Sequence, residues 1–397
     1  MVRSDVQLSS GTAAPTLPER CEFAAPTRII AWPGCARARL PAELLALGVS
    51  RVAVVADRGF AETGMLDPLL ADVQGVQMAV RALVGEDPDV AEAERAAAAA
   101  LEAGAGAVLA IGGGSALCAA KAAAIRLRNP APLTAYAGSG RLPAPPAPVI
   151  AVPTTAGSGS EVSNVVVLHE PSQTCDLVIR GRGYEPRVAL LDGSLLATLP
   201  PRPLIHAALD ALSHALEALW VHGASSFTDA LALAAAHAIA ESLPRVLDAC
   251  GRQNAEATDA RQALIEASAS ANLACGNSGL GLVHALTSAP AVGLPHGYQN
   301  GVLLPHVAEF NLPAVRPRFR EELRRLADLY ERIGFSARFA PSELPAAGVD
   351  AMVAAALANP FRENNCRPAG EPELRALLAA AVGKAAGAAP AGQAAVR

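Results

Sequence analysis

Four side chains in the second half of the sequence combine one carboxylate with three imidazoles. Asp210 and His214 stand four residues apart in a stretch with helical periodicity, so they share one face of the predicted helix. His284 belongs to another helical stretch, and His296 lies at a predicted junction between a loop and a helix. One carboxylate and three imidazoles suit a borderline divalent ion such as Fe(II) or Zn(II). Spacing alone leaves ordinary surface or core histidines as the alternative, because this region holds further histidines.

A glycine-rich turn offers a second kind of site. Gly112, Gly113, Gly114 and Ser115 join a predicted strand at residues 107–111 to an Ala-rich predicted helix. Glycines let the backbone approach a phosphate closely, and a helix N-terminus provides free N–H groups. The pattern GxGxxG is absent, so this is not the standard Rossmann fingerprint. A plain strand-to-helix turn is the alternative.

Other polar groups accompany the ends of the predicted strands. The loop after residues 149–153 carries Thr154, Thr155 and Ser158, whose hydroxyls could bind a polar ligand. Asp57 closes another strand, where an acid can accept hydrogen bonds from an adenosine ribose, or can simply cap a helix. Lys121 lies in the helix after the glycine turn, in a chain with two lysines and thirty arginines. An ammonium cannot be exchanged for a guanidinium without changing the geometry, which singles this lysine out.

The elements that must position these groups fall into two kinds. Before Pro200, predicted strands alternate with helices, which indicates βαβ units and a parallel sheet. The strands are expected at residues 51–57, 76–83, 107–111 and 149–153, with a helix at 90–103. After Pro200 only helices are expected, at residues 204–251, 254–275, 316–333 and 371–385. We therefore divide the chain into an extension (1–25), an α/β domain (26–200), a helical domain (201–384) and a disordered tail (385–397).

Composition narrows the class of protein. Hydrophobic residues make up 52% of the chain and charged residues 17%, which argues against disorder over most of its length. The net charge of −5 argues against a nucleic-acid partner. Because no run of 18 apolar residues is free of Gly and charge, and no secretory signal is found, we expect no membrane span. Seven scattered cysteines without a CxxC pair fit a reducing cytoplasm.

Together, four ordered blocks resemble the iron-containing (group III) alcohol dehydrogenase family. They are the GGGS turn with its helix at residues 112–121, the loop VPTTAGSGSEVS at 152–163, the segment VALLDGSLLATLPPRPLIHAALDALSH at 188–214, and residues 279–311. The resemblance covers about residues 28–383. It implies a dehydroquinate synthase-like fold: an α/β N-terminal nucleotide-binding domain plus an all-α C-terminal metal-binding domain, with the active site between them.

The resemblance also implies activity and residue roles. We expect metal-dependent, NAD(H)-linked interconversion of a small alcohol and an aldehyde or ketone. Asp210, His214, His284 and His296 would form the catalytic metal site, with Fe(II) favoured over Zn(II). Cofactor-binding residues would be Asp57, Gly112, Gly113, Gly114, Ser115, Lys121, Thr154, Thr155 and Ser158, and Asp57 favours NAD over NADP. Broad apolar helices in the second half indicate a homodimer or larger assembly.

Three departures from the family pattern suggest a specialised substrate. Ser288 stands where members commonly have a histidine four residues after His284, the loop from His284 to His296 is about two residues shorter, and Cys118 replaces an Asp. We expect a pocket altered from that of simple-alcohol enzymes.

Other functions remain open at this point. They are a maleylacetate reductase-like enone-acid reductase, a lyase of the dehydroquinate synthase-like group, and a non-catalytic subunit.

Overall fold

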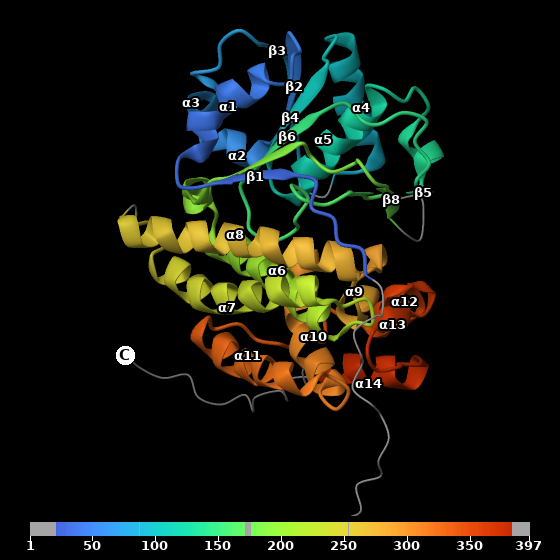
Figure 1. Ribbon diagram of the computed structural model, residues 1–397. Coiled ribbons are helices and arrows are strands. Elements are labelled where there is room, and N and C mark those ends of the chain that lie inside the picture. Colours follow the sequence, from blue (N-terminus) through green and yellow to red (C-terminus); the bar gives the residue numbers. More distant parts are fainter. Residues whose placement is uncertain (1–20, 87, 171–175, 253, 383–397) are drawn as a thin grey trace, which may run out of the picture.

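The computed structural model describes residues 21–86, 88–170, 176–252 and 254–382. A layer built on a parallel sheet lies above a larger set of helices (Figure 1). This arrangement, α/β in the N-terminal half and helical in the C-terminal half, confirms the expected fold class. The predicted tail, residues 385–397, and most of the predicted extension lie outside the described residues.

The main sheet has six strands, all parallel, in the order β1-β9-β6-β4-β2-β3. The strands are β1 (Arg28–Ala31), β2 (Arg51–Asp57), β3 (Gln77–Val84), β4 (Ala107–Gly112), β6 (Val149–Pro153) and β9 (Val188–Leu191). The four strands predicted from periodicity are therefore present, and β1 completes one edge.

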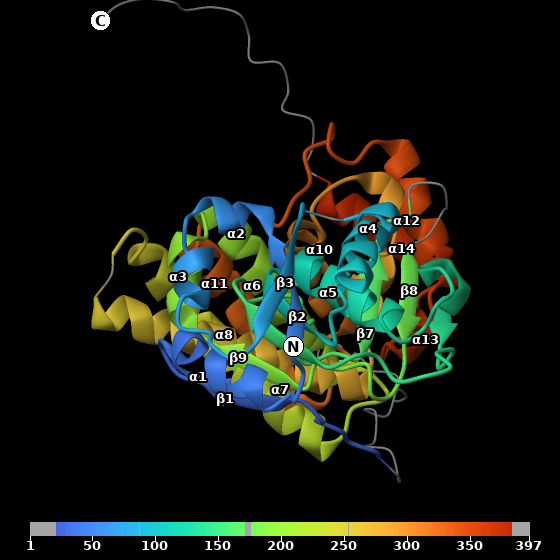
Figure 2. The ribbon, with the colours of Figure 1, turned by 90° about the horizontal axis from the view of Figure 1, so that it is seen from above.

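Helices cover both faces of this sheet. Figure 2 shows α1 (Cys35–Leu45), α2 (Arg58–Glu62) and α3 (Leu66–Leu70) on one side, and α4 (Val90–Glu102) and α5 (Gly114–Arg126) on the other. In β4, Val108 and Ala110 pack toward α4 and α5, whereas Leu109 and Ile111 pack toward α1 and α3. Because both faces are buried, the strand reads as a continuous apolar run.

The strand order reverses between β2 and β4. From β2 the chain moves outward to β3, and from β4 it moves in the opposite direction to β6 and β9. Ligands of such sheets bind outside the carboxyl ends of the strands at this switch point. Asp57 and Gly112 are the residues that end these two strands.

A second, three-stranded sheet was not predicted. It consists of β5 (Gly138–Ser139), β7 (Val165–Leu168) and β8 (Leu177–Arg180), in the order β5-β8-β7. Its strands have four residues or fewer, too short for periodicity to identify.

The C-terminal half packs around α6 (Pro201–Trp220), which begins with a proline at its first helical position. Its neighbours include α7 (Ser226–Asp248), α8 (Ala255–Ser278) and α10 (His296–Asn311). The remaining helices are α9 (Leu282–Leu286), α11 (Arg320–Arg332), α12 (Ala346–Ala358), α13 (Phe361–Asn364) and α14 (Glu371–Ala381).

The continuous helix predicted for residues 204–251 is wrong. The chain leaves α6 at Val221, and Ser225 starts α7 with a capping box to Thr228. Since Ser at an N-cap satisfies otherwise unpaired N–H groups, the Ser225-Ser226 pair carried the signal of this break.

One helix of the described residues, α7, is long and apolar enough to span a membrane by length and composition. It packs along α6 and α8 within the helical half (Figure 1). A core helix of this kind passes the same test, so α7 is weak evidence for a membrane span.

Candidate active site

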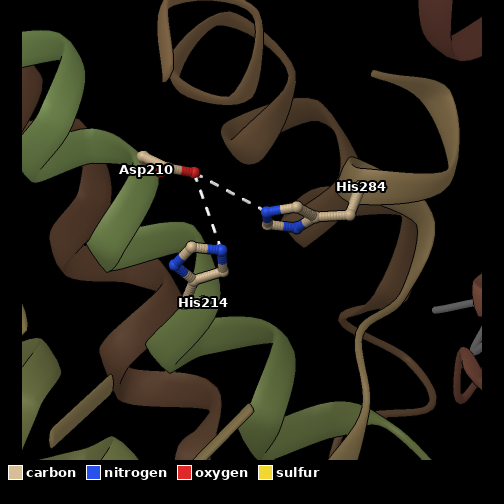
Figure 3. A group of neighbouring side chains, drawn as sticks. All are labelled: Asp210, His214 and His284. Atoms are coloured by element: carbon tan, nitrogen blue, oxygen red, sulfur yellow. Dashed lines mark ion pairs between the residues drawn. The ribbon is translucent and has the colours of Figure 1, made fainter. Parts of the chain in front are cut away.

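Three helices bring the predicted ion ligands together. Asp210 and His214 project from the same face of α6, His284 comes from α9, and His296 is the first residue of α10. Figure 3 shows Asp210, His214 and His284 pointing toward one another. The Nε2 atoms of His284, His214 and His296 lie 3.6, 3.7 and 3.8 Å from Asp210 Oδ1.

These distances fit a divalent ion. Two ligand atoms that are each about 2.1 Å from an ion in tetrahedral geometry are about 3.4 Å apart. The ligand atoms of Asp210, His214 and His284 lie within 4.8 Å of one another, and all three residues are buried. His296 is 50% exposed, which leaves one side of the cluster open. A carboxylate and imidazoles are donors that bind Zn(II) and Fe(II).

The surroundings favour the metal-binding protonation states of Asp210 and His214, whereas they favour the protonated form of His284. Burial opposes ionisation of Asp210, but His214 and its neighbouring imidazoles outweigh it and hold the carboxyl pKa well below its usual range. Burial lowers the pKa of His214 to about 3. Burial also disfavours the charged form of His284, whereas hydrogen bonds to Asp210 and Glu217 raise its pKa to about 9. Asp210 is therefore anionic and His214 neutral near pH 7.

Glu217 is a site residue that the sequence interpretation missed. Its Oε2 lies 2.7 Å from His284 Nδ1, and its side chain is fully buried. It follows Asp210 by seven residues and His214 by three, so it occupies the same face of α6. This spacing was the available signal.

The loop that carries Thr154, Thr155 and Ser158 is called the hydroxyl-rich loop. It faces the glycine turn at the ends of β4 and β6. Thr154 N donates to Gly112 O at 3.0 Å. A Cβ built on Gly113 would lie 3.2 Å from Thr155 Cγ2, and one on Gly114 would lie 2.6 Å from Ser158 Oγ. The backbone of the glycine turn therefore packs against side chains of the hydroxyl-rich loop.

The N-terminus of α5 has no side-chain cap that would occupy its first N–H groups. Gly113 is its N-cap, and no side chain caps the helix. The first N–H groups of a helix lack intrahelical partners, and they favour an anion such as a phosphate. Ser115 lies in the first turn of this helix.

Asp57 both caps α2 and borders the glycine turn. Its Oδ1 accepts a hydrogen bond from Phe60 N at 2.7 Å. A Cβ built on Gly112, whose φ is +144°, would lie 2.6 Å from Asp57 Cβ. The helix-capping alternative therefore describes a real contact, and the ribose role stays a prediction.

Lys121 lies away from the glycine turn. It is nearly fully buried, and its Nζ donates to Ser163 O at 3.2 Å, Ser163 Oγ at 3.2 Å and Val165 O at 2.6 Å. These contacts connect α5 to Ser163, which follows the hydroxyl-rich loop, and to Val165, the first residue of β7. Any effect of Lys121 on a cofactor would act through these residues.

The hydroxyl-rich loop connects the two halves of the molecule. Asn272 Nδ2, on α8, donates to Gly157 O at 2.7 Å. A Cβ on Gly157 would lie 2.8 Å from Ala207 O, on α6, so the backbones nearly touch. Ala207 precedes Asp210 by three residues, so the loop lies beside the helix that carries the ion ligands.

Ser288 and Cys118, two of the departures from the family pattern, each contact a polar atom of the chain. Ser288 Oγ donates to Ala285 O at 2.7 Å, and Cys118 Sγ lies 3.4 Å from Ser160 Oγ. Ser288 therefore bonds to its own turn of the chain.

Comparison with known proteins gives matches over both halves. Residues 26–193 match the family described as "Iron-containing alcohol dehydrogenase", and residues 204–382 match "Fe-containing alcohol dehydrogenase family, C-terminal". The chain is 34% identical to the "Probable alcohol dehydrogenase EutG" of Salmonella typhimurium (strain LT2), over 85% of this chain and 89% of that protein.

Solved structures agree with these matches. A 1,3-propanediol oxidoreductase has a TM-score of 0.83 and 26% identity, covering 91% of this chain and all of that one. Sulfoacetaldehyde reductase from Bifidobacterium kashiwanohense, solved with NAD+, has a TM-score of 0.81 and 27% identity, covering 92% and 99%. Maleylacetate reductase from Agrobacterium tumefaciens has a TM-score of 0.75 and 26% identity, covering 92% and 99%.

Proposed function

The chain belongs to the iron-containing alcohol dehydrogenase family, and from this premise we propose that it interconverts an alcohol and an aldehyde or ketone with NAD(H) and a divalent ion. The observation that carries the proposal is the convergence of three imidazole Nε2 atoms on Asp210 Oδ1 at 3.6–3.8 Å. The cluster lies beside the loop that faces the glycine turn.

Asp210, His214, His284 and His296 are the proposed ligands of the ion. An ion held by these residues would supply Lewis-acid polarisation of the alcohol oxygen, and a bound nicotinamide cofactor would supply the hydride chemistry. His284 donates a hydrogen bond from Nδ1–H to Glu217, which leaves Nε2 as the ligand atom. The donor set of one carboxylate and three imidazoles suits both Fe(II) and Zn(II), and membership of the iron-containing family favours Fe(II).

The cofactor is proposed to lie at the switch point of the sheet. Gly112, Gly113, Gly114 and Ser115 would hold the pyrophosphate, with Thr154, Thr155 and Ser158 along the nucleotide and nicotinamide. Asp57 would accept the ribose hydroxyls, and its charge would repel the 2′-phosphate of NADP.

The partners follow from the same proposal. The substrate is a small alcohol or carbonyl compound, and named relatives include a 1-propanol dehydrogenase and a 1,3-propanediol dehydrogenase. We propose a homodimer or larger assembly, supported by the edge strand β1, in which Ile29 is 38% exposed and after which Trp32 is 43% exposed. The free state of the six described cysteines supports a cytoplasmic location.

A maleylacetate reductase-like activity is the second candidate, because maleylacetate reductases share the fold. The convergence of one carboxylate and three imidazoles, a donor set that suits a divalent ion, favours the alcohol dehydrogenase.

Turnover assays separate these candidates. NAD+ reduction should be measured with a series of primary alcohols, NADH oxidation with the matching aldehydes, and NADH oxidation with maleylacetate. We expect turnover with an alcohol–carbonyl pair, with a kcat/KM higher for a larger substrate than for ethanol to butanol. Turnover of maleylacetate alone would favour the second candidate.

A further inference from the structure

A buried amide contacts two of the proposed ion ligands. Asn300 lies on α10, one turn after His296, and its side chain is fully buried. Its Nδ2 donates to Asp210 Oδ1 at 2.7 Å and lies 3.2 Å from His284 Nε2. No role was predicted for Asn300 from the sequence.

The carboxylate of Asp210 fixes the orientation of this amide. A carboxylate only accepts hydrogen bonds when ionised, so the amide atom that faces Asp210 must be the nitrogen. The other end of the amide, Asn300 Oδ1, accepts from Thr287 Oγ1 at 2.8 Å. Thr287 follows α9 and is buried. The bonds thus run in one direction, from Thr287 to Asn300 to Asp210.

We propose that Thr287 and Asn300 are positioning residues that hold Asp210 Oδ1 toward the three imidazoles and so set the affinity of the site for a divalent ion. This proposal rests on the proposed function of the cluster as an ion site. A carboxylate oxygen can accept a hydrogen bond and still face a cation. The contact with His284 Nε2 uses the lone pair that an ion needs, so only the Asp210 bond is compatible with ligation.

Two other roles of the Asn300 amide would change the ion affinity differently when the amide is removed. If the amide mainly competed with the ion for His284 Nε2, removing it would tighten binding. If the amide only filled space, an apolar side chain of similar size would serve equally well. The sign and size of the change in ion affinity therefore distinguish positioning from both.

The test is a Zn2+ titration of the full-length, metal-free chain against a chromophoric chelator. Thr287→Val removes the hydroxyl at nearly constant volume, Thr287→Ser restores it, and Asn300→Leu removes the amide. Thr228→Val is the matched control, because Thr228 is a buried threonine whose hydroxyl bonds only within the cap of α7. Circular dichroism and thermal unfolding check that each variant is folded.

We expect Thr287→Val to weaken Zn2+ binding about 10-fold or more and Asn300→Leu up to about 100-fold, as for other residues that orient metal ligands. Thr287→Ser and Thr228→Val should bind like wild type. Wild-type-like or tighter binding by Thr287→Val overturns the proposal, even if Asn300→Leu fails to fold. Failure of the wild type to bind Zn2+ overturns the ion site itself, and this inference with it.

Discussion

Glu217 and His284 form a fully buried carboxylate–imidazole pair, with Oε2 2.7 Å from Nδ1. The backbone N–H groups of Gly281 and Val283 donate to the same carboxylate, at 3.1 and 2.7 Å. Three donors therefore compensate the buried charge of Glu217. Because Glu217 engages Nδ1, the ring presents Nε2 to Asp210.

Replacing Glu217 with Gln should weaken ion binding. The amide keeps the size of the side chain but loses the charge that makes His284 a stronger ligand, and such changes cost about 10–100-fold in metal affinity. Competition with a chelator measures this change. Glu43→Gln is the control, since Glu43 is a buried carboxylate in the other half of the chain. If Glu217→Gln binds the ion with unchanged affinity, the charge of Glu217 does not strengthen His284 as a ligand.

Gly114→Ala should reduce NAD+ affinity and leave ion content unchanged. The added Cβ would lie 2.6 Å from Ser158 Oγ and 2.7 Å from Ser158 Cβ, so the loop must move away from the glycine turn. Overpacking of this kind costs about 1–3 kcal/mol of stability unless the loop moves. Because the displaced loop would no longer line the proposed cofactor site, we expect NAD+ to bind about tenfold more weakly, which corresponds to about 1.4 kcal/mol of binding free energy. Isothermal titration with NAD+ measures the effect.

The matched control for that variant is Gly276→Ala on α8. A Cβ there meets nothing within 4 Å, and alanine is a better helix former than glycine. If both variants bind NAD+ like wild type, the close packing of turn and loop does not serve the cofactor.

Lys121→Met should destabilise the α/β half. The variant leaves the buried oxygens Ser163 O and Val165 O without their donor, and each unsatisfied group costs about 1–3 kcal/mol. Denaturant unfolding measures the loss. Arg37→Met, which removes an exposed cation paired with Asp72, should leave the free energy of unfolding unchanged. If Lys121→Met is as stable as wild type, the hydrogen bonds of Lys121 to these backbone oxygens do not stabilise the α/β half.

Glu161 should make stability depend on pH. Burial raises the pKa of its carboxyl from about 4.5 to about 7, with Lys121 opposing the rise. A raised pKa means that the folded state prefers the protonated form, so this stabilisation is full below about pH 4.5 and is lost as the pH rises through 7. At about 1.4 kcal/mol per pH unit, the loss amounts to about 3 kcal/mol.

Glu161→Gln isolates this effect, because the amide is neutral at every pH. The free energy of unfolding of wild type, taken relative to the variant, should fall between pH 4.5 and 8 in urea unfolding series. A constant or rising difference would show that the carboxyl is ionised in the folded protein throughout.

The sequence predicted elements where local signals were strong. Strands β2, β4 and β6 are buried apolar runs, so their residues identify them. In contrast, β1 has four residues and pairs with β9, about 160 residues later in the chain. β7 and β8 are equally short and pair with each other. Such strands depend on partners that no local pattern specifies.

The same limit applies to the site. The four-residue spacing of Asp210 and His214 predicted their shared helix face, but only tertiary packing brings His284 and His296 to them. The spacing of Glu217 placed it on the ligand face of α6, but its role and that of Asn300 depend on partners that lie on other helices. Lys121 was singled out by its rarity, and its partners are mainly backbone oxygens.

Metal content tests the central claim most directly. The full chain should be purified without a chelator or histidine tag and with oxygen excluded, and analysed for iron and zinc beside an Asp210→Ala variant. We expect about one ion per wild-type chain and none in the folded variant, because Asp210 faces all three imidazoles. A wild-type chain without metal, even after addition of Fe(II) or Zn(II), would contradict this expectation.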